Sequence, residues 1–116
     1  MEVVVSRMSE AVVTRHGAKR IKERIGLGRG SIQRNVEKAL ADGVTHAETK
    51  GSLCRYLDRI YLLNQRPNNM RVYNHMVYLF RGRTLITVLP LPQKYYSCAN
   101  KIQKQKTKME EDKWQR

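Results

Sequence analysis

Two dense runs of β-branched and aromatic residues flank a short glycine turn, and this pattern limits the fold more than any other feature of the chain. The runs cover residues 76–80 and 84–89, and Arg81-Gly82-Arg83 joins them. Such an arrangement predicts a β-hairpin. Both runs are largely apolar on both faces, which is typical of strands that lie inside a sheet covered by helices. We therefore expect strands near 76–81 and 84–89, preceded by another near 70–73.

The segments before the hairpin show helical periodicity. After Thr14, a good helix N-cap, apolar residues recur at spacings of three and four, which indicates one apolar stripe of a helix. Similar patterns follow, so we expect helices near 14–25, 31–41 and 51–64. Helices followed by strands predict an α+β fold, with N-terminal helices packed on a small antiparallel β-sheet of about three to four strands.

The length of 116 residues suits a single domain. We place this α+β domain at residues 1–96, with a loosely ordered leader over 1–11 in which Val3–Val5 is either a short strand or unstructured. Residues 44–50 are polar and predict a loop. Residues 97–116 are rich in lysine, and we expect a basic C-terminal tail that is partly helical or disordered.

The charge balance gives the strongest functional signal. The chain has 23 Lys and Arg against 10 Asp and Glu, a net charge of +13. Such a field concentrates polyanions, and nucleic acid binds through its phosphates with release of counterions. We expect a nucleic-acid partner, in the first place RNA. A basic surface that only aids solubility, or one that meets an anionic membrane, would give the same composition.

The sequence gives little support for a membrane span, a metal site or a bound cofactor. No apolar run approaches the ~20 residues of a membrane span, and the first residues do not resemble a signal peptide, so we expect a cytoplasmic protein without membrane contact. Cys54 and Cys98 form no CxxC pair and no zinc-finger spacing, so both read as free thiols. Acidic residues are too scattered for a magnesium nuclease. We expect no metal and no cofactor.

The first helix carries the residues best suited to chemistry. With Ala18 and Ile21 toward the core, His16 and Arg20 project to the opposite, wet face, and Arg24 lies on its flank. His16 and Arg20 are an i, i+4 pair, so their side chains can converge on one ligand. A histidine can move protons near neutral pH, and an arginine can hold a phosphate. A solvated helix face without function is the simpler alternative.

Each of three further features allows two interpretations. His75 lies between two strand segments, as a turn residue or as a catalytic group. Thr87 is a hydroxyl in an apolar strand, either bonded structurally or open to a site on the sheet. Gly26, Gly28 and Gly30 form a helix–helix turn or a phosphate loop, and the turn is favoured because a preceding strand is missing.

The segment Thr14-Arg15-His16-Gly17-Ala18-Lys19-Arg20-Ile21-Lys22-Glu23-Arg24 resembles a known motif. It is similar to the His-Ala-x-x-Arg-x-x-x-Arg opening helix of small uncharacterised bacterial proteins found in Firmicutes and their mobile elements. Those proteins resemble the RelE-like branch of the barnase–EndoU–colicin–RelE ribonuclease superfamily. The resemblance covers about residues 12–96. Gly17 departs from the motif, because the family usually has alanine there.

The resemblance implies a metal-independent endoribonuclease, or a protein derived from one, that is toxin-like and has an antitoxin or other protein as a partner. It implies a catalytic set of His16, Arg20, Arg24 and Thr87. Together with the charge it implies a nucleic-acid contact made by Arg15, Lys19, Arg20 and Arg24. The alternatives are a non-catalytic RNA- or DNA-binding protein and a structural or interaction module of a mobile element.

Overall fold

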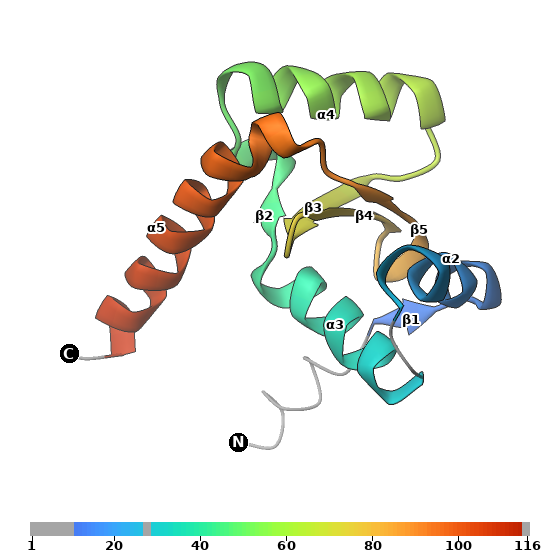
Figure 1. Cartoon of the computed structure of the whole chain (residues 1–116). Helices are drawn as coiled ribbons and strands as arrows, with labels where there is room; N and C mark the ends of the chain where they lie inside the picture. The colour runs from blue at the N-terminus through green and yellow to red at the C-terminus, as the bar shows by residue number, and fades with distance from the viewer. Residues whose placement is uncertain (1–10, 27–28, 115–116) are drawn as a thin grey trace.

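A five-stranded mixed sheet with helices on both faces forms the centre of the protein (Figure 1). The computed structural model describes residues 11–26 and 29–114. Its elements are β1 (Val12–Val13), α2 (Arg15–Ile25), α3 (Arg29–Asp42), β2 (Val44–Thr45), the 3-10 turn η1 (His46–Glu48), α4 (Gly51–Asn64), β3 (Asn69–Tyr73), β4 (Met76–Arg81), β5 (Thr84–Pro90), the 3-10 turn η2 (Gln93–Tyr95) and α5 (Tyr96–Trp114). The strand order is β1-β5-β4-β3-β2. The predicted leader, with Val3–Val5, lies outside the described residues apart from Ala11.

The α+β fold class is confirmed, but the prediction of three to four antiparallel strands is wrong. The sheet has five strands, and β1 runs parallel to β5. The other addition, β2, lies in the segment that we expected to be a loop. Both additions are two-residue strands at the edges of the sheet. Pairing with β5 and β3 holds them in place, and so short a segment has too little pattern of its own to reveal a strand.

The sheet separates two apolar clusters, as the two-sided strands predicted. Val77 and Leu79 of β4 pack with α4 and the start of α5. Tyr78 and Phe80 point the other way and pack with α2 and α3. All four side chains are at most 1% exposed. This alternation fixes the register of β4, since a shift by one residue would exchange the two faces.

A β-bulge interrupts the pairing of β4 with β5. Leu79 pairs with Thr87, but the next residue, Phe80, pairs with Leu85, so Ile86 is the extra residue on β5. The bulge changes the alternation along β5. Leu85 and Val88 both belong to the cluster under α2 and α3. Thr87 therefore lies on the same face as its partner Leu79, toward α4.

The turns and caps follow the local sequence. Thr14 is the N-cap of α2, and its Oγ1 accepts a hydrogen bond from the Gly17 amide at 3.0 Å. Gly26 ends α2 in the left-handed region at φ 79°, which fits the helix–helix turn. Gly82 turns the β4–β5 hairpin at φ 63°. His75 lies in the β3–β4 turn at φ 64°, and its ring stacks on Tyr96 with centroids 3.8 Å apart.

The C-terminal segment forms α5, which begins inside the segment assigned to the domain. Ala99 is buried in the cluster under α4. Further along, Gln103 donates to the Asp42 carbonyl at 2.9 Å, and the Lys106 ammonium donates to the Gly43 carbonyl at 2.9 Å. These polar side chains attach the helix to the α3–β2 junction, which composition alone did not reveal. Among the described helices, none is long and apolar enough to cross a bilayer.

Candidate active site

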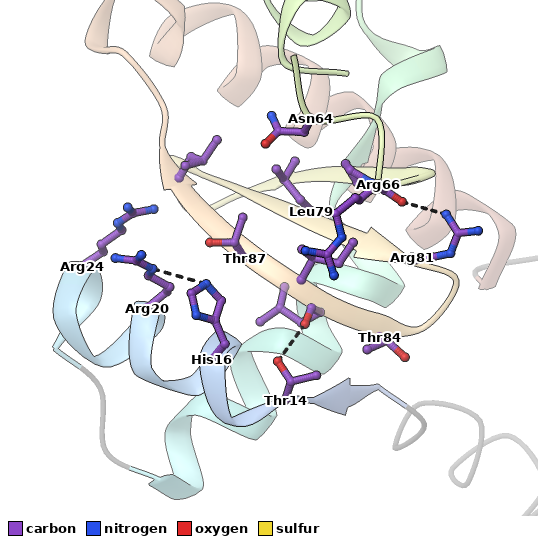
Figure 2. Close-up of a pocket in the computed structure, with 14 residues that line it drawn as sticks. Thr14, His16, Arg20, Arg24, Asn64, Arg66, Leu79, Arg81, Thr84 and Thr87 are labelled. Atoms are coloured by element: carbon purple, nitrogen blue, oxygen red, sulfur yellow. Dashed lines mark hydrogen bonds between the residues drawn. The ribbon is translucent and has the colours of Figure 1, made fainter. Parts of the chain in front are cut away.

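A pocket of about 710 Å³ opens between α2, β5 and the C-terminal end of α4. Figure 2 shows its side chains, with α2 on one side and the segment after α4 on the other. Its lining residues are Thr14, His16, Arg20, Arg24, Asn64, Arg66, Pro67, Leu79, Arg81, Thr84, Leu85, Ile86, Thr87 and Leu89. Three segments distant in the sequence therefore meet at one cavity.

The four residues of the predicted catalytic set line this one pocket: His16, Arg20, Arg24 and Thr87. The Thr87 hydroxyl points toward the three α2 side chains (Figure 2). The two remaining residues of the predicted nucleic-acid contact, Arg15 and Lys19, lie exposed on α2 and are not among the lining residues. The structure thus places them beside the pocket, not in it.

Gly17 sets how α2 faces the sheet. A Cβ at this position would lie 3.1 Å from Leu85 Cδ2 and 3.2 Å from the Leu85 carbonyl oxygen, so a side chain here would require its neighbours to give by a few tenths of an ångström. Gly17 and Ile21 are buried as a result, and Ala18 is only partly buried. Ile21 faces the core as expected, and Ala18 packs against the same apolar cluster. His16 is exposed and the Arg20 side chain is 40% exposed, as expected of the wet face, and both residues border the pocket.

Hydrogen bonds link the polar side chains of α2. Arg20 Nε donates to His16 Nε2 at 3.4 Å, and Arg20 Nη1 lies 3.4 Å from Glu23 Oε1. The Arg20 side chain is 40% exposed, so both contacts are accessible to solvent and weak. A phosphate in the pocket can therefore replace His16 and Glu23 as the partner of the Arg20 guanidinium at little cost in free energy.

Arg24 covers the edge of the sheet. β1 pairs only with Thr84 and Leu85, so in the described part of the chain β5 has no neighbouring strand beyond Leu85 on this side. Arg24 Nη1 donates to the Val88 carbonyl at that edge. This contact satisfies an edge acceptor and fixes the arginine beside Thr87.

Sequence reasoning missed two arginines on the far side of the pocket. Arg66 follows α4, and its side chain reaches over β5 toward the space that His16 and Arg20 face (Figure 2). Its carbonyl accepts a hydrogen bond from Arg81 Nη1 at 2.9 Å, which joins the α4–β3 connection to the end of β4. Neither residue belongs to a motif: the return of α4 over the sheet brings Arg66 to the pocket, and the end of β4 brings Arg81.

The charge of the lining is of one sign. Among the residues that the structure describes, four guanidinium groups and one imidazole line the pocket, and no carboxylate does. The hydroxyls of Thr14, Thr84 and Thr87 and the amide of Asn64 supply further hydrogen bonds. Arginine matches phosphate oxygens in geometry as well as charge. The pocket thus suits a phosphate group, and it offers none of the carboxylate ligands by which proteins hold Mg²⁺ at phosphate sites.

Comparison with known proteins gives no match of any kind: no family model, no curated protein and no solved structure is similar to this chain.

Proposed function

We propose that the protein is a metal-independent endoribonuclease, or descends from one, and that the pocket between α2, β5 and α4 is its active site. The observation that carries the proposal is the meeting of His16, Arg20, Arg24 and Thr87 with Arg66 around one cavity. One group able to move a proton lies there among several able to bind phosphate. The net charge of +13 gives the surface the field that attracts RNA.

The proposed reaction uses the RNA's own 2′-hydroxyl. This oxygen loses its proton and attacks the adjacent phosphorus, while the bond to the 5′-oxygen breaks and that oxygen takes up a proton. The products are a 2′,3′-cyclic phosphate and a 5′-hydroxyl. His16 transfers one of these protons as general acid or base. Arg20, Arg24 and Arg66 stabilise the negative charge that grows on the phosphate oxygens.

The absence of carboxylates from the lining favours this chemistry over a two-metal mechanism. It also favours an RNA substrate over DNA, because DNA lacks the nucleophile that the mechanism needs. Thr87 contributes a hydroxyl close to the α2 side chains, and it donates to the substrate's phosphate or ribose.

The second candidate is a protein that binds RNA in the same pocket without cutting it. The observation in its favour is that arginines outnumber proton-transferring groups in the lining, with four guanidinium groups beside His16. Binding through phosphates alone needs only the arginines. Both candidates predict salt-sensitive binding, so they differ only in cleavage.

Cleavage of end-labelled RNA by the purified protein in the presence of EDTA tests the proposal. We expect products with 2′,3′-cyclic phosphate ends, and we expect no cleavage of an oligonucleotide with a 2′-deoxy sugar at the scissile position. That oligonucleotide should still bind. Salt-sensitive binding of RNA without any cleavage would establish the binding protein and contradict the enzyme.

A further inference from the structure

A histidine, a cysteine and an aspartate, none of which lines the pocket between α2 and β5, meet where η1 packs against α4. One ligand atom from each of His46, Cys54 and Asp58 lies within 4.8 Å of the other two. His46 belongs to η1, and the other two residues are one helical turn apart on α4. We propose that these three side chains bind one zinc-type divalent transition-metal ion.

The ligand types fit such an ion. Zinc prefers thiolate and imidazole, accepts a carboxylate, and is tetrahedral. Magnesium and calcium prefer oxygen ligands only, so a site with one oxygen ligand among three discriminates against them. The spacing of Cys54 and Asp58 at i and i+4 puts both on one face of the helix.

The distances require only small side-chain movements. Ligand atoms around a tetrahedral zinc lie roughly 3–4 Å apart, from bond lengths of about 2.0–2.3 Å. His46 Nε2 and Asp58 Oδ1 are 2.5 Å apart and share a hydrogen bond. The ion takes the place of the proton between these two atoms and of the Cys54 thiol proton. The Asp58 side chain is 53% exposed and free to open by about an ångström for this exchange.

The backbone on the histidine side is held firmly. Thr45 and Glu48 form a capping box around η1, and the Lys106 ammonium lies 3.0 Å from Glu48 Oε1. The His46 carbonyl accepts hydrogen bonds from the Thr49 hydroxyl at 2.6 Å and from the Thr49 amide at 3.1 Å. This turn therefore presents the imidazole to α4 from a fixed position, which lowers the entropy lost on binding.

Three protein ligands leave one coordination position for water or an added ligand. A cavity of about 290 Å³ adjoins His46 and is lined also by Tyr61, Asn68 and Met70. There is thus space for an added ligand beside His46. An ion here would tie η1 to α4 and would contact none of the residues that line the RNA pocket, so the proposal stands or falls independently of the ribonuclease.

Titration of the full, metal-free chain with Co²⁺ tests the site, because cobalt bound to a thiolate gives a charge-transfer band in the near ultraviolet. We expect this band to saturate at one equivalent, to disappear on addition of Zn²⁺, and to persist in excess Mg²⁺. C54S should lose the band, and C98S, the matched control with the other free thiol, should keep it in full.

Two further variants keep the test decisive if C54S folds poorly by circular dichroism. H46Q and D58N retain the thiol and should bind Co²⁺ more weakly than the parent, with a shift of the visible bands. Absence of the band in the parent, its survival in a folded C54S, or equal loss in C98S would overturn the proposal, as would unchanged affinity in both H46Q and D58N.

Discussion

Gly17 of α2 packs directly on Leu85 of β5, with 3.1 Å between a Cβ built at the glycine and Leu85 Cδ2. Glycine usually weakens a helix, and replacing it with alanine in a helix interior gains about 1 kcal/mol. Here the Leu85 carbonyl oxygen would also be within 3.2 Å of the new methyl group, and the sheet holds that oxygen in place. The close contact therefore brings His16 and Thr87 to the same cavity.

We predict that G17A gains no stability and lowers RNA cleavage, because α2 and Leu85 must separate by a few tenths of an ångström to admit the methyl group. The free energy of unfolding in urea and the cleavage rate measure the two effects. T107A provides the control, since Thr107 is exposed on α5 and the same kind of change should stabilise that helix by about 0.5 kcal/mol without affecting cleavage. A G17A protein that is about 1 kcal/mol more stable and fully active would contradict the role of this contact.

The elements that the sequence revealed are those with strong local patterns. Three helices and three strands lie within about two residues of their predicted bounds. The dense apolar run over β4, the helix cap at Thr14 and the hairpin turn at Gly82 needed no tertiary information. By contrast, β1 and β2 form because β5 and β3 provide pairing partners. A two-residue strand is too short for its local sequence pattern to predict it.

For the site, too, the local sequence predicted some features, and others depend on the tertiary structure. The i, i+4 spacing of His16 and Arg20 was visible in the sequence, but the close approach of α2 to Leu85 at Gly17 was not. The bulge at Ile86 decides the face of Thr87, and bulges have no reliable signal in a single sequence. Arg66 reaches the pocket because α4 returns across the sheet, which is a property of topology.

Arg66 provides a prediction about electrostatics. The described residues give its guanidinium no carboxylate partner, so it should contribute a full phosphate contact. R66A should weaken binding of single-stranded RNA and reduce the slope of log K against log salt concentration by about 0.7, the value for one phosphate contact. The control is R55A, which removes an exposed arginine of α4 outside the pocket lining. Equal slopes for R66A and the parent would remove Arg66 from the interface.

Tyr78 provides a prediction about alkaline pH. Burial, together with a smaller contribution from the nearby Tyr73, raises the pKa of this phenol to about 12. The unfolded chain ionises its tyrosine near pH 10, so the folded state binds more protons between about pH 10 and 12. Stability from this group is complete below pH 10 and falls as the pH rises, by roughly 2–3 kcal/mol.

Y78F removes the ionisable group and keeps the ring. Denaturant unfolding from pH 9 to 12 should show a shallower loss of stability in the variant than in the parent. Lysine and arginine ionisation affects both proteins equally, so the difference isolates Tyr78. Parallel curves for the two proteins would contradict the burial of this hydroxyl in the cluster under α2 and α3.

In the proposed reaction, His16 transfers a proton and the arginines of the pocket bind the phosphate. H16A should lower RNA cleavage by roughly 10²–10⁴, the usual contribution of a general acid or base, and leave RNA affinity nearly unchanged because four arginines of the lining remain. R20A should lower both cleavage and affinity, since it removes a phosphate contact as well as charge stabilisation. K22A, an exposed cation of the same helix outside the lining, should change cleavage little.

The most direct measurement of the central claim is therefore the cleavage rate of labelled RNA in EDTA, with RNA affinity determined in parallel, for the parent, H16A and K22A. The account predicts cleavage by the parent and by K22A, and a large loss in H16A at nearly constant affinity. Cleavage by H16A at the parental rate, or a parent protein that binds RNA and never cuts it, would contradict the account.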